Sequence, residues 1–209
     1  MTTDTPVKGE KGVVARDIAR AAAKLFAATG YDATSVSMIV NAAGVTKPTL
    51  YYHFGSKEGL AQALVTVPMN ELIARLRTIV ESPGDPVTAL EQMLEAHFAF
   101  CRDDPDRSRF VYALFFGPLG SELAAELARF GQALCDVMAG GVRRLAEDGR
   151  IATDRVDACT VALRGLLVIS TMDYLYHGAD LGAELARRLV GDLLRGFEGP
   201  RTCDRGQRS

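Results

Sequence analysis

Apolar residues recur every three or four positions along almost the whole chain, and this helical spacing is the feature that most restricts the fold. The first apolar stripe runs from Ile18 to Phe26 and stops at Thr29-Gly30. No alternation of apolar and polar residues, the pattern of a half-buried strand, rises above the background. The pattern therefore predicts an all-α protein of about nine helices.

Glycine and capping residues divide the first part of this pattern. A short helix is expected to begin behind Thr34 or Ser35 and to end at Gly44. A second short helix is expected over residues 47–54, with Thr46 as its N-cap. Two short helices joined in this way have the shape of a helix-turn-helix, whose second helix enters the major groove of DNA.

The rest of the chain predicts longer helices. Ser56 is expected to cap a long helix that Pro68 kinks or divides. The clearest break follows at residues 82–86, which read Ser-Pro-Gly-Asp-Pro. Further helices are expected over residues 87–101, 107–116, 121–147, 154–176 and 181–197.

Positive charge is concentrated at the start of the chain. All five lysines lie in residues 1–60, where the net charge is +2, whereas residues 61–209 carry a net charge of −4. This asymmetry is expected when only the first part of a chain meets a polyanion, although an excess of two charges is a weak signal by itself. The overall net charge of −2 argues against a protein whose whole surface coats nucleic acid.

The cysteines are widely spaced, which favours reduced intracellular thiols over disulfides or a zinc site. They are Cys101, Cys135, Cys159 and Cys203. The uncharged run at residues 165–172 is too short to span a bilayer, and no N-terminal segment resembles a signal peptide. We therefore expect a cytoplasmic protein with no metal, no cofactor and no membrane partner.

The helix expected over residues 47–54 has one buried and one exposed side. At 100° per residue, Leu50 and Phe54 fall together, and Tyr52 lies opposite them. Lysine at position 47 suits a guanine, and the apolar atoms of Pro48 and Thr49 suit a thymine methyl group. Side chains suited to phosphate are those of Tyr51, His53 and Lys57. Ordinary core packing of the Tyr-Tyr-His-Phe run is the alternative.

The segment TSVSMIVNAAGVTKPTLYYHFGSKEGL, residues 34–60, resembles the DNA-binding region of TetR-family transcriptional regulators. The Gly-Val, Thr-Leu-Tyr, His-Phe and Ser-Lys-Glu groups stand in the family's order and spacing, and the resemblance covers roughly residues 14–65. Val40 stands where the family usually has alanine. Ser37 stands where a longer polar residue is common, so the first short helix is expected to contribute less to the DNA contact.

The resemblance also implies a role for each residue that matches the family's motif. Base edges are approached by Lys47, Pro48, Thr49 and Tyr52, and phosphates are held by Tyr51, His53 and Lys57. These roles agree with those that the helical wheel assigns. Together with Ser37, these residues form the predicted DNA contact.

The last two helices suit a two-fold dimer with a four-helix interface. Residues 157–175 are apolar on most sides of the helix, and the final helix carries a broad apolar stripe. The resemblance implies the same arrangement, and completion of a monomeric core is the alternative. The predicted interface residues are Leu163, Leu167, Leu185, Leu189 and Leu193.

Aromatic residues gather between positions 97 and 116, where core packing explains most of them. The resemblance implies an effector pocket in this part of the chain. Because no cluster of basic residues accompanies it, the effector is expected to be compact and largely apolar. The predicted lining residues are His97, Phe100, Tyr112, Phe115, Phe116, Met172 and Tyr176.

The predicted organisation is a disordered arm over residues 1–12, a helix-turn-helix domain over 13–58, a helical ligand-binding and dimerisation domain over 59–198, and a disordered tail over 199–209. The predicted function is that of a homodimeric repressor, released from a palindromic double-stranded DNA operator by a small molecule. A helical enzyme is one alternative, but the chain lacks G-x-S-x-G, a phosphate loop and H-E-x-x-H. A TetR-like protein that acts through a protein partner is the other.

Overall fold

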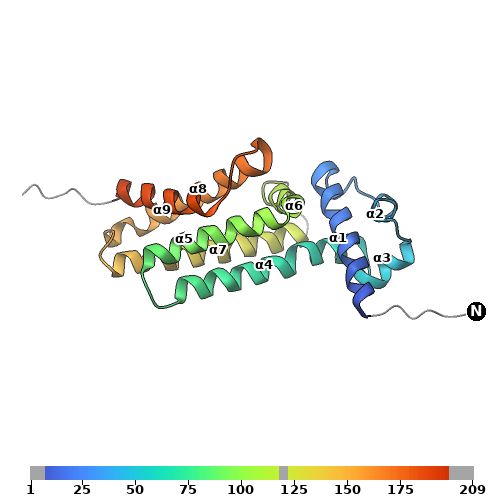
Figure 1. Cartoon of the computed structure of the whole chain (residues 1–209), viewed down its shortest axis with the longest axis horizontal. Helices are drawn as coiled ribbons and strands as arrows, with labels where there is room; N and C mark the ends of the chain where they lie inside the picture. Colours follow the sequence, from blue (N-terminus) through green and yellow to red (C-terminus); the bar gives the residue numbers. More distant parts are fainter. Residues whose placement is uncertain (1–7, 118–121, 198–209) are drawn as a thin grey trace, which may run out of the picture. The chain divides into compact units, whose positions relative to one another are not determined.

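The computed structural model of the chain describes residues 8–117 and 122–197 (Figure 1). Within these ranges the protein forms nine α-helices, one short 3-10 helix and no strand, which confirms the predicted all-α class. The helices are α1 (Lys8–Thr29), α2 (Val36–Ala43), α3 (Lys47–Phe54), α4 (Lys57–Glu81), α5 (Pro86–Asp103), α6 (Pro105–Phe115), α7 (Glu122–Glu147), α8 (Val156–His177) and α9 (Ala183–Phe197).

Side-chain caps set where several helices begin. The hydroxyl of Ser35 accepts a hydrogen bond from the backbone N–H of Met38 at 3.2 Å, so Ser35 rather than Thr34 caps α2. Ser56 caps α4 in the same way, through the N–H of Gly59 at 3.0 Å. Asp104 caps α6 by accepting from the N–H of Arg107 at 2.9 Å.

Two expectations about α1 and α4 need correction. Helix α1 begins at Lys8, so the prediction of a disordered arm is wrong for residues 8–12. Lysine and glutamate are good helix formers, which favours a helix over these residues. Helix α4 continues through Pro68, so this proline does not divide it. Residues 1–7 of the predicted arm and residues 199–209 of the predicted tail lie outside the described residues.

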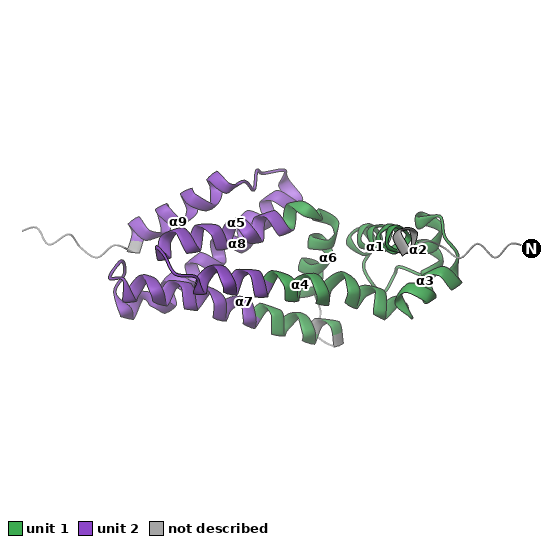
Figure 2. Ribbon diagram, turned by 60° about the horizontal axis from the view of Figure 1, so that its bottom comes forward, with its two compact units in different colours: residues 1–72, 101–131 green, residues 73–100, 132–209 purple. Residues whose placement is uncertain are grey.

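The chain forms two compact units (Figure 2). The first comprises residues 1–72 and 101–131, and the second comprises residues 73–100 and 132–209. This division differs from the predicted boundary at residue 58, because α6 joins the unit that contains α1, α2 and α3.

In the first unit, α1 packs against α2, α3 and α6. Its buried stripe includes Ile18, Ala22 and Phe26, as the helical spacing predicts. Ile39 of α2 and Leu50 of α3 are buried in the same unit. The apolar side of each short helix is therefore held by the first unit, which leaves the opposite side open to solvent.

In the second unit, a glycine allows three helices to approach closely. A Cβ atom on Gly141 of α7 would lie 2.6 Å from Cδ2 of Leu90 in α5 and 3.5 Å from Cγ1 of Val80 in α4. Only hydrogen fits at this point without a shift of the neighbouring side chains. The largest fully buried side chains of the second unit are those of Leu76, Leu90, Met93, Leu94 and Phe98.

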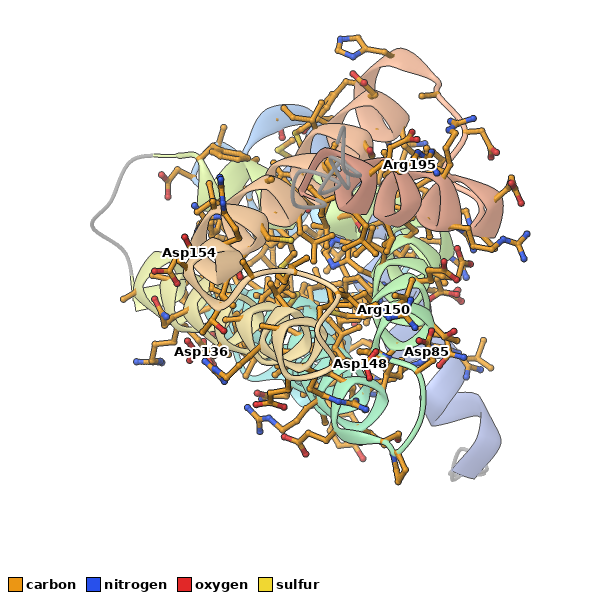
Figure 3. The ribbon with its side chains drawn as sticks, turned by 90° about the vertical axis from the view of Figure 1, so that its left-hand side faces the viewer. Asp85, Asp136, Asp148, Arg150, Asp154 and Arg195 are labelled. Atoms are coloured by element: carbon orange, nitrogen blue, oxygen red, sulfur yellow. The ribbon has the colours of Figure 1, made fainter. Side chains whose placement is uncertain are left out.

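A group of charged side chains joins two connections at one end of the second unit (Figure 3). Nε of Arg150 lies 3.0 Å from Oδ2 of Asp148, and Nη2 lies 3.4 Å from Oδ1 of Asp85. All three side chains are solvent-exposed, so these ion pairs contribute little to stability. The group links the connection after α7 to the residue that precedes α5.

Candidate nucleic-acid interface

The turn between α2 and α3 depends on one glycine and one threonine. Gly44 adopts the left-handed conformation, with φ of 67° and ψ of 29°, and ends α2. The backbone of Thr46 is extended, and its hydroxyl accepts a hydrogen bond from the N–H of Thr49 at 3.4 Å. Pro48 lies in the first turn of α3, where a missing N–H leaves no bond unmade.

Helix α3 presents its polar residues to solvent. Leu50 is buried, as the helical wheel predicts, and Phe54 is half-buried. On the opposite side, 69% of Tyr52 and 46% of Tyr51 are exposed. The exposed and half-buried residues Lys47, Pro48, Thr49, Tyr51, Tyr52 and His53 are called the α3 face below.

The α3 face has its own internal contacts. The rings of Tyr52 and His53 lie 5.1 Å apart between centroids, in an edge-to-face arrangement. At its edge, the hydroxyl of Thr49 lies 2.9 Å from that of Thr46, the N-cap of α3, within hydrogen-bond distance. Tyrosine and imidazole groups on an exposed helix can donate to base edges and phosphates, so this face has the chemistry that groove recognition requires.

Helix α2 contributes a smaller surface. Ser37 is exposed, and Val40 is buried. Met38 is also partly exposed, with 37% of its surface accessible. A serine hydroxyl reaches less far than a longer polar side chain, so α2 offers fewer donors than α3.

The ammonium group of Lys57 faces the protein instead of solvent. Its Nζ donates hydrogen bonds to the backbone carbonyls of Tyr31 at 2.9 Å and Thr34 at 3.0 Å. It also lies 4.2 Å from the centre of the Tyr31 ring. The structure thus separates Lys57 from the other predicted DNA-contacting residues.

Tyr31 is a residue that sequence reasoning missed, although its place beside Gly30 at the end of α1 was a signal of a turn. Its hydroxyl donates to Oε1 of Glu58 at 3.2 Å. Burial, followed by the negative charge of Glu58, raises the pKa of Tyr31 to about 12. Hydrogen bonds from its own backbone N–H and from Ser56, with smaller contributions from Tyr31 and the charge of Lys57, lower the pKa of the Glu58 carboxyl. Glu58 therefore stays ionised beside the lysine at neutral pH.

The predicted dimer-interface residues differ in how far they are buried in a single copy. Leu163, Leu167 and Leu193 are buried within the second unit of a single copy, and their assignment to an interface stays a prediction. Leu185 and Leu189 are half-buried.

The apolar residues that α8 exposes to solvent are not the leucines predicted for the dimer interface. Val161 is 62% exposed, Ile169 is 61% exposed and Tyr176 is 53% exposed, with Gly165 exposed between them. Residues 153–177 are long and apolar enough to cross a membrane by composition, a test that helices of soluble proteins also pass. Because α8 is apolar almost all round, the sequence held no signal that separates its inner face from its outer face.

The predicted pocket residues also divide by exposure. His97 is buried, and burial lowers the pKa of its imidazole to about 4. Phe100, Tyr112 and Met172 are half-buried. Phe115, Phe116 and Tyr176 are exposed, so these three do not line an enclosed cavity. The ring of Phe115 instead covers Gly131, where a Cβ atom would lie 2.8 Å from Cε2 of the ring.

Among the described residues, no group of three or more His, Cys, Asp or Glu side chains is placed to hold a metal ion. Cys101, Cys135 and Cys159 are present as thiols, and burial raises the pKa of Cys159. Cys203 lies outside the described residues.

The chain is similar to known transcription regulators. Residues 18–64 match the family model of bacterial regulatory proteins of the tetR family. The HTH-type transcriptional repressor KstR2 of Mycobacterium tuberculosis is 39% identical over 77 residues, which cover 37% of this chain and only 38% of that relative. KstR2 of Rhodococcus jostii is 26% identical over 202 residues, which cover 94% of this chain and 96% of that relative.

The fold is shared with a solved structure of the same family. The TetR family transcriptional regulator PfmR from Thermus thermophilus superposes with a TM-score of 0.72 at 27% identity, over 87% of this chain and 99% of PfmR. The matched family model contains α2, α3 and the exposed aromatic residues described above. This chain therefore carries, in residues 18–64, the DNA-binding domain of the tetR family of bacterial regulatory proteins.

Proposed function

We propose that this protein is a cytoplasmic, dimeric transcriptional repressor that binds a palindromic DNA operator and is released by a small, largely apolar effector. The observation that carries this proposal is the α3 face, on which Tyr52 is 69% exposed directly opposite the buried Leu50. Tyrosine on the exposed side of a recognition helix can hydrogen-bond to base edges and pack against them, and the KstR2 relatives are named as repressors.

The α3 face would divide its contacts between bases and phosphates. Lys47, Pro48, Thr49 and Tyr52 would approach base edges, because the N-terminal part of a recognition helix points into the major groove. The flanking side chains of Tyr51 and His53 would hold phosphates, with Ser37 of α2 beside them. Base contacts would specify the sequence, and phosphate contacts would set the register.

A second copy of the chain would supply the other half of the site. Two half-sites about 34–36 Å apart are read by dimers of helix-turn-helix proteins. The exposed residues Val161, Gly165, Ile169 and Tyr176 of α8 form an apolar face, and Leu185 and Leu189 of α9 are half-buried. Covering these residues with the same face of a second copy would remove apolar surface from water.

The effector would bind in the helical part of the chain beyond α4. His97, Phe100 and Met172 are the predicted lining residues that are buried or half-buried in the second unit. A ligand that prefers one conformation of the protein weakens DNA binding by the same factor by which DNA weakens ligand binding. The relatives named above are transcription regulators, and none of them supports a helical enzyme.

Selection of bound sequences from a random duplex pool tests the proposal. The refolded protein, stripped of any bound ligand, is expected to enrich a palindrome whose affinity falls steeply with salt. The substitution Tyr52→Ala should weaken binding by about 1–3 kcal/mol per half-site, or roughly 5-fold to 150-fold, and relax selection at the contacted base pairs.

The control is Phe116→Ala, which removes an aromatic ring that is 62% exposed at the end of α6. This variant should bind the selected duplex as the unsubstituted protein does. Failure to enrich any sequence at moderate salt, or equal losses for the two variants, would rule out the α3 face as the DNA contact.

A further inference from the structure

The positive charge of the first sixty residues lies on α1 and not on the α3 face. Helix α1 carries five basic and two acidic residues, a net charge of +3, whereas the rest of residues 1–60 carries a net charge of −1. Helix α2 has no charged residue, and α3 has a single lysine, Lys47. The α3 face therefore does not account for the charge asymmetry between the two parts of the chain.

Three of the basic residues of α1 form one exposed row. Arg16, Arg20 and Lys24 follow one another at intervals of four residues, and all three are exposed. At 100° per residue they fall within about 80° of one another. Arg20 exposes 79% of its side chain. These three residues are called the α1 row below.

The α1 row lies on the side of α1 that faces away from the core of the first unit. Ile18, Ala22 and Phe26 are buried and fall on the opposite side of the helix. Helix α1 packs against α2, α3 and α6. The α1 row is therefore a surface of the first unit that is separate from the α3 face.

The α1 row brings like charges together. Equal charges four residues apart on a helix repel each other and destabilise it. Asp17 lies 3.7 Å from Arg20, but both side chains are at least half exposed, so this ion pair contributes little. A polyanion lying along the row would relieve the repulsion.

The dimensions of the α1 row fit a nucleic-acid strand. Arg16 and Lys24 are eight positions apart, which corresponds to a rise of about 12 Å along the helix. One strand of DNA carries a charge about every 3.4 Å along the axis of the duplex, so roughly three phosphates match the three basic side chains. The charge and the length of the row are therefore complementary to a phosphate backbone.

We propose that the α1 row is a docking surface for the phosphate backbone of non-specific DNA, distinct from the α3 face that reads the operator. Contacts with phosphates supply essentially all of non-specific binding and allow a protein to slide along a duplex. The α1 row thus holds the protein on DNA of any sequence during the search, and the α3 face takes over at the operator. The inference rests on the proposed function for the operator with which non-specific DNA is compared.

Salt titration with two duplexes tests the α1 row. One is the duplex selected in the experiment above, and the other is a shuffled duplex of the same length and composition. The row variant carries Arg16→Gln, Arg20→Gln and Lys24→Gln, which remove three charges and keep good helix formers.

The two duplexes should respond differently to the row variant. On the shuffled duplex, the slope of log affinity against log salt should fall in magnitude by about 0.9 for each lost contact, or about 2.7 for the row of one copy. The affinity for this duplex should fall roughly 10-fold or more at low salt. On the selected duplex, the slope should stay the same and the affinity should stay within about 2-fold, because backbone contacts of the α1 row are not part of that complex. Sequence selectivity should therefore rise.

The control variant removes three exposed charges from the second unit through Arg75→Gln, Arg77→Gln and Arg143→Gln. It should bind both duplexes as the unsubstituted protein does. The double variant Arg16→Lys and Arg20→Lys keeps the charge of the row and should keep the slope on the shuffled duplex. A loss of slope in this charge-conserving variant, or an equal loss in the control variant, would contradict the assignment of the charge to phosphate contacts.

Two other outcomes would overturn the inference. An unchanged slope and affinity on the shuffled duplex would show that the α1 row is a solvated surface or meets a partner other than DNA. An equal fall of the slope on both duplexes would place the row in the operator complex as well. If no sequence is enriched in the selection, the proposed function fails, while titration of the shuffled duplex still decides the α1 row.

Discussion

The ring of Phe110 in α6 lies 4.8 Å from the ring of Phe26 in α1, measured between centroids, and both side chains are buried. These residues are far apart in sequence, yet they belong to the same compact unit as α3. Helix α6 is therefore part of the structure that supports the α3 face, a relationship that the resemblance to the family did not indicate.

Replacement of Phe110 should destabilise the protein strongly. Phe110→Ala removes a fully buried ring between α1 and α6, which typically costs about 3–5 kcal/mol of unfolding free energy. Urea unfolding followed by circular dichroism measures the difference. Phe116→Ala, at an exposed position of the same sequence region, should stay within about 0.5 kcal/mol. Equal losses for the two variants would show that the contact with Phe26 does not stabilise the unit.

Replacement of Gly44 should act through backbone conformation alone. A Cβ atom at this position meets no heavy atom within 4 Å, but φ is +67°. Gly44→Ala should therefore cost about 1–2 kcal/mol, the penalty of an L-residue in the left-handed conformation. Gly44→Asn should cost less, because asparagine tolerates this conformation better. Thermal unfolding of both variants checks the order, and a larger loss for asparagine would contradict the conformational explanation.

Stability should fall as the pH is lowered, because of His97. Burial lowers the pKa of this imidazole from 6.5 to about 4, so between these values the unfolded chain binds a proton that the folded protein does not. The part of the unfolding free energy that depends on a neutral His97 is fully present above pH 6.5 and is lost progressively down to pH 4. It amounts to about 3 kcal/mol at most. The titration-free variant His97→Gln should show a smaller change in unfolding free energy over this range. An identical pH dependence in both proteins would exclude His97 as its source.

The exposed face of α8 should control assembly without controlling folding. Ile169→Arg places a charge on a side chain that is 61% exposed, so the fold should persist while the proposed dimer dissociates. Sedimentation analysis should show a monomer with unchanged helical content. Gln92→Arg on the exposed side of α5 is the control and should remain a dimer.

A charge on the buried face of α8 is expected to disrupt folding rather than assembly alone. Leu167 is fully buried, so Leu167→Arg should unfold the protein, because a charge is placed in the core without a partner. A folded monomer from Leu167→Arg, or an unchanged dimer from Ile169→Arg, would reverse the assignment of the two faces.

The sequence by itself determined the features that depend on neighbours within one or two turns of helix. Gly44 ends α2 because glycine readily adopts the left-handed conformation, which depends on no distant residue. Thr46 caps α3 by accepting a hydrogen bond from an N–H three residues away. The spacing of Leu50 and Tyr52 places them on opposite sides of α3 wherever the helix packs. These local rules were sufficient for the helix count and for the α3 face.

Only the tertiary structure decided which residues meet across long stretches of chain. Lys57 has the same charge as Lys47, but its partners Tyr31 and Thr34 lie 26 and 23 residues earlier, and no periodicity connects them. In α8, Leu167 and Ile169 are equally apolar, so hydrophobicity could not tell which one faces the core. The physical reason is the same in both cases: a side chain's chemistry is encoded locally, whereas its surroundings are set by packing against distant segments.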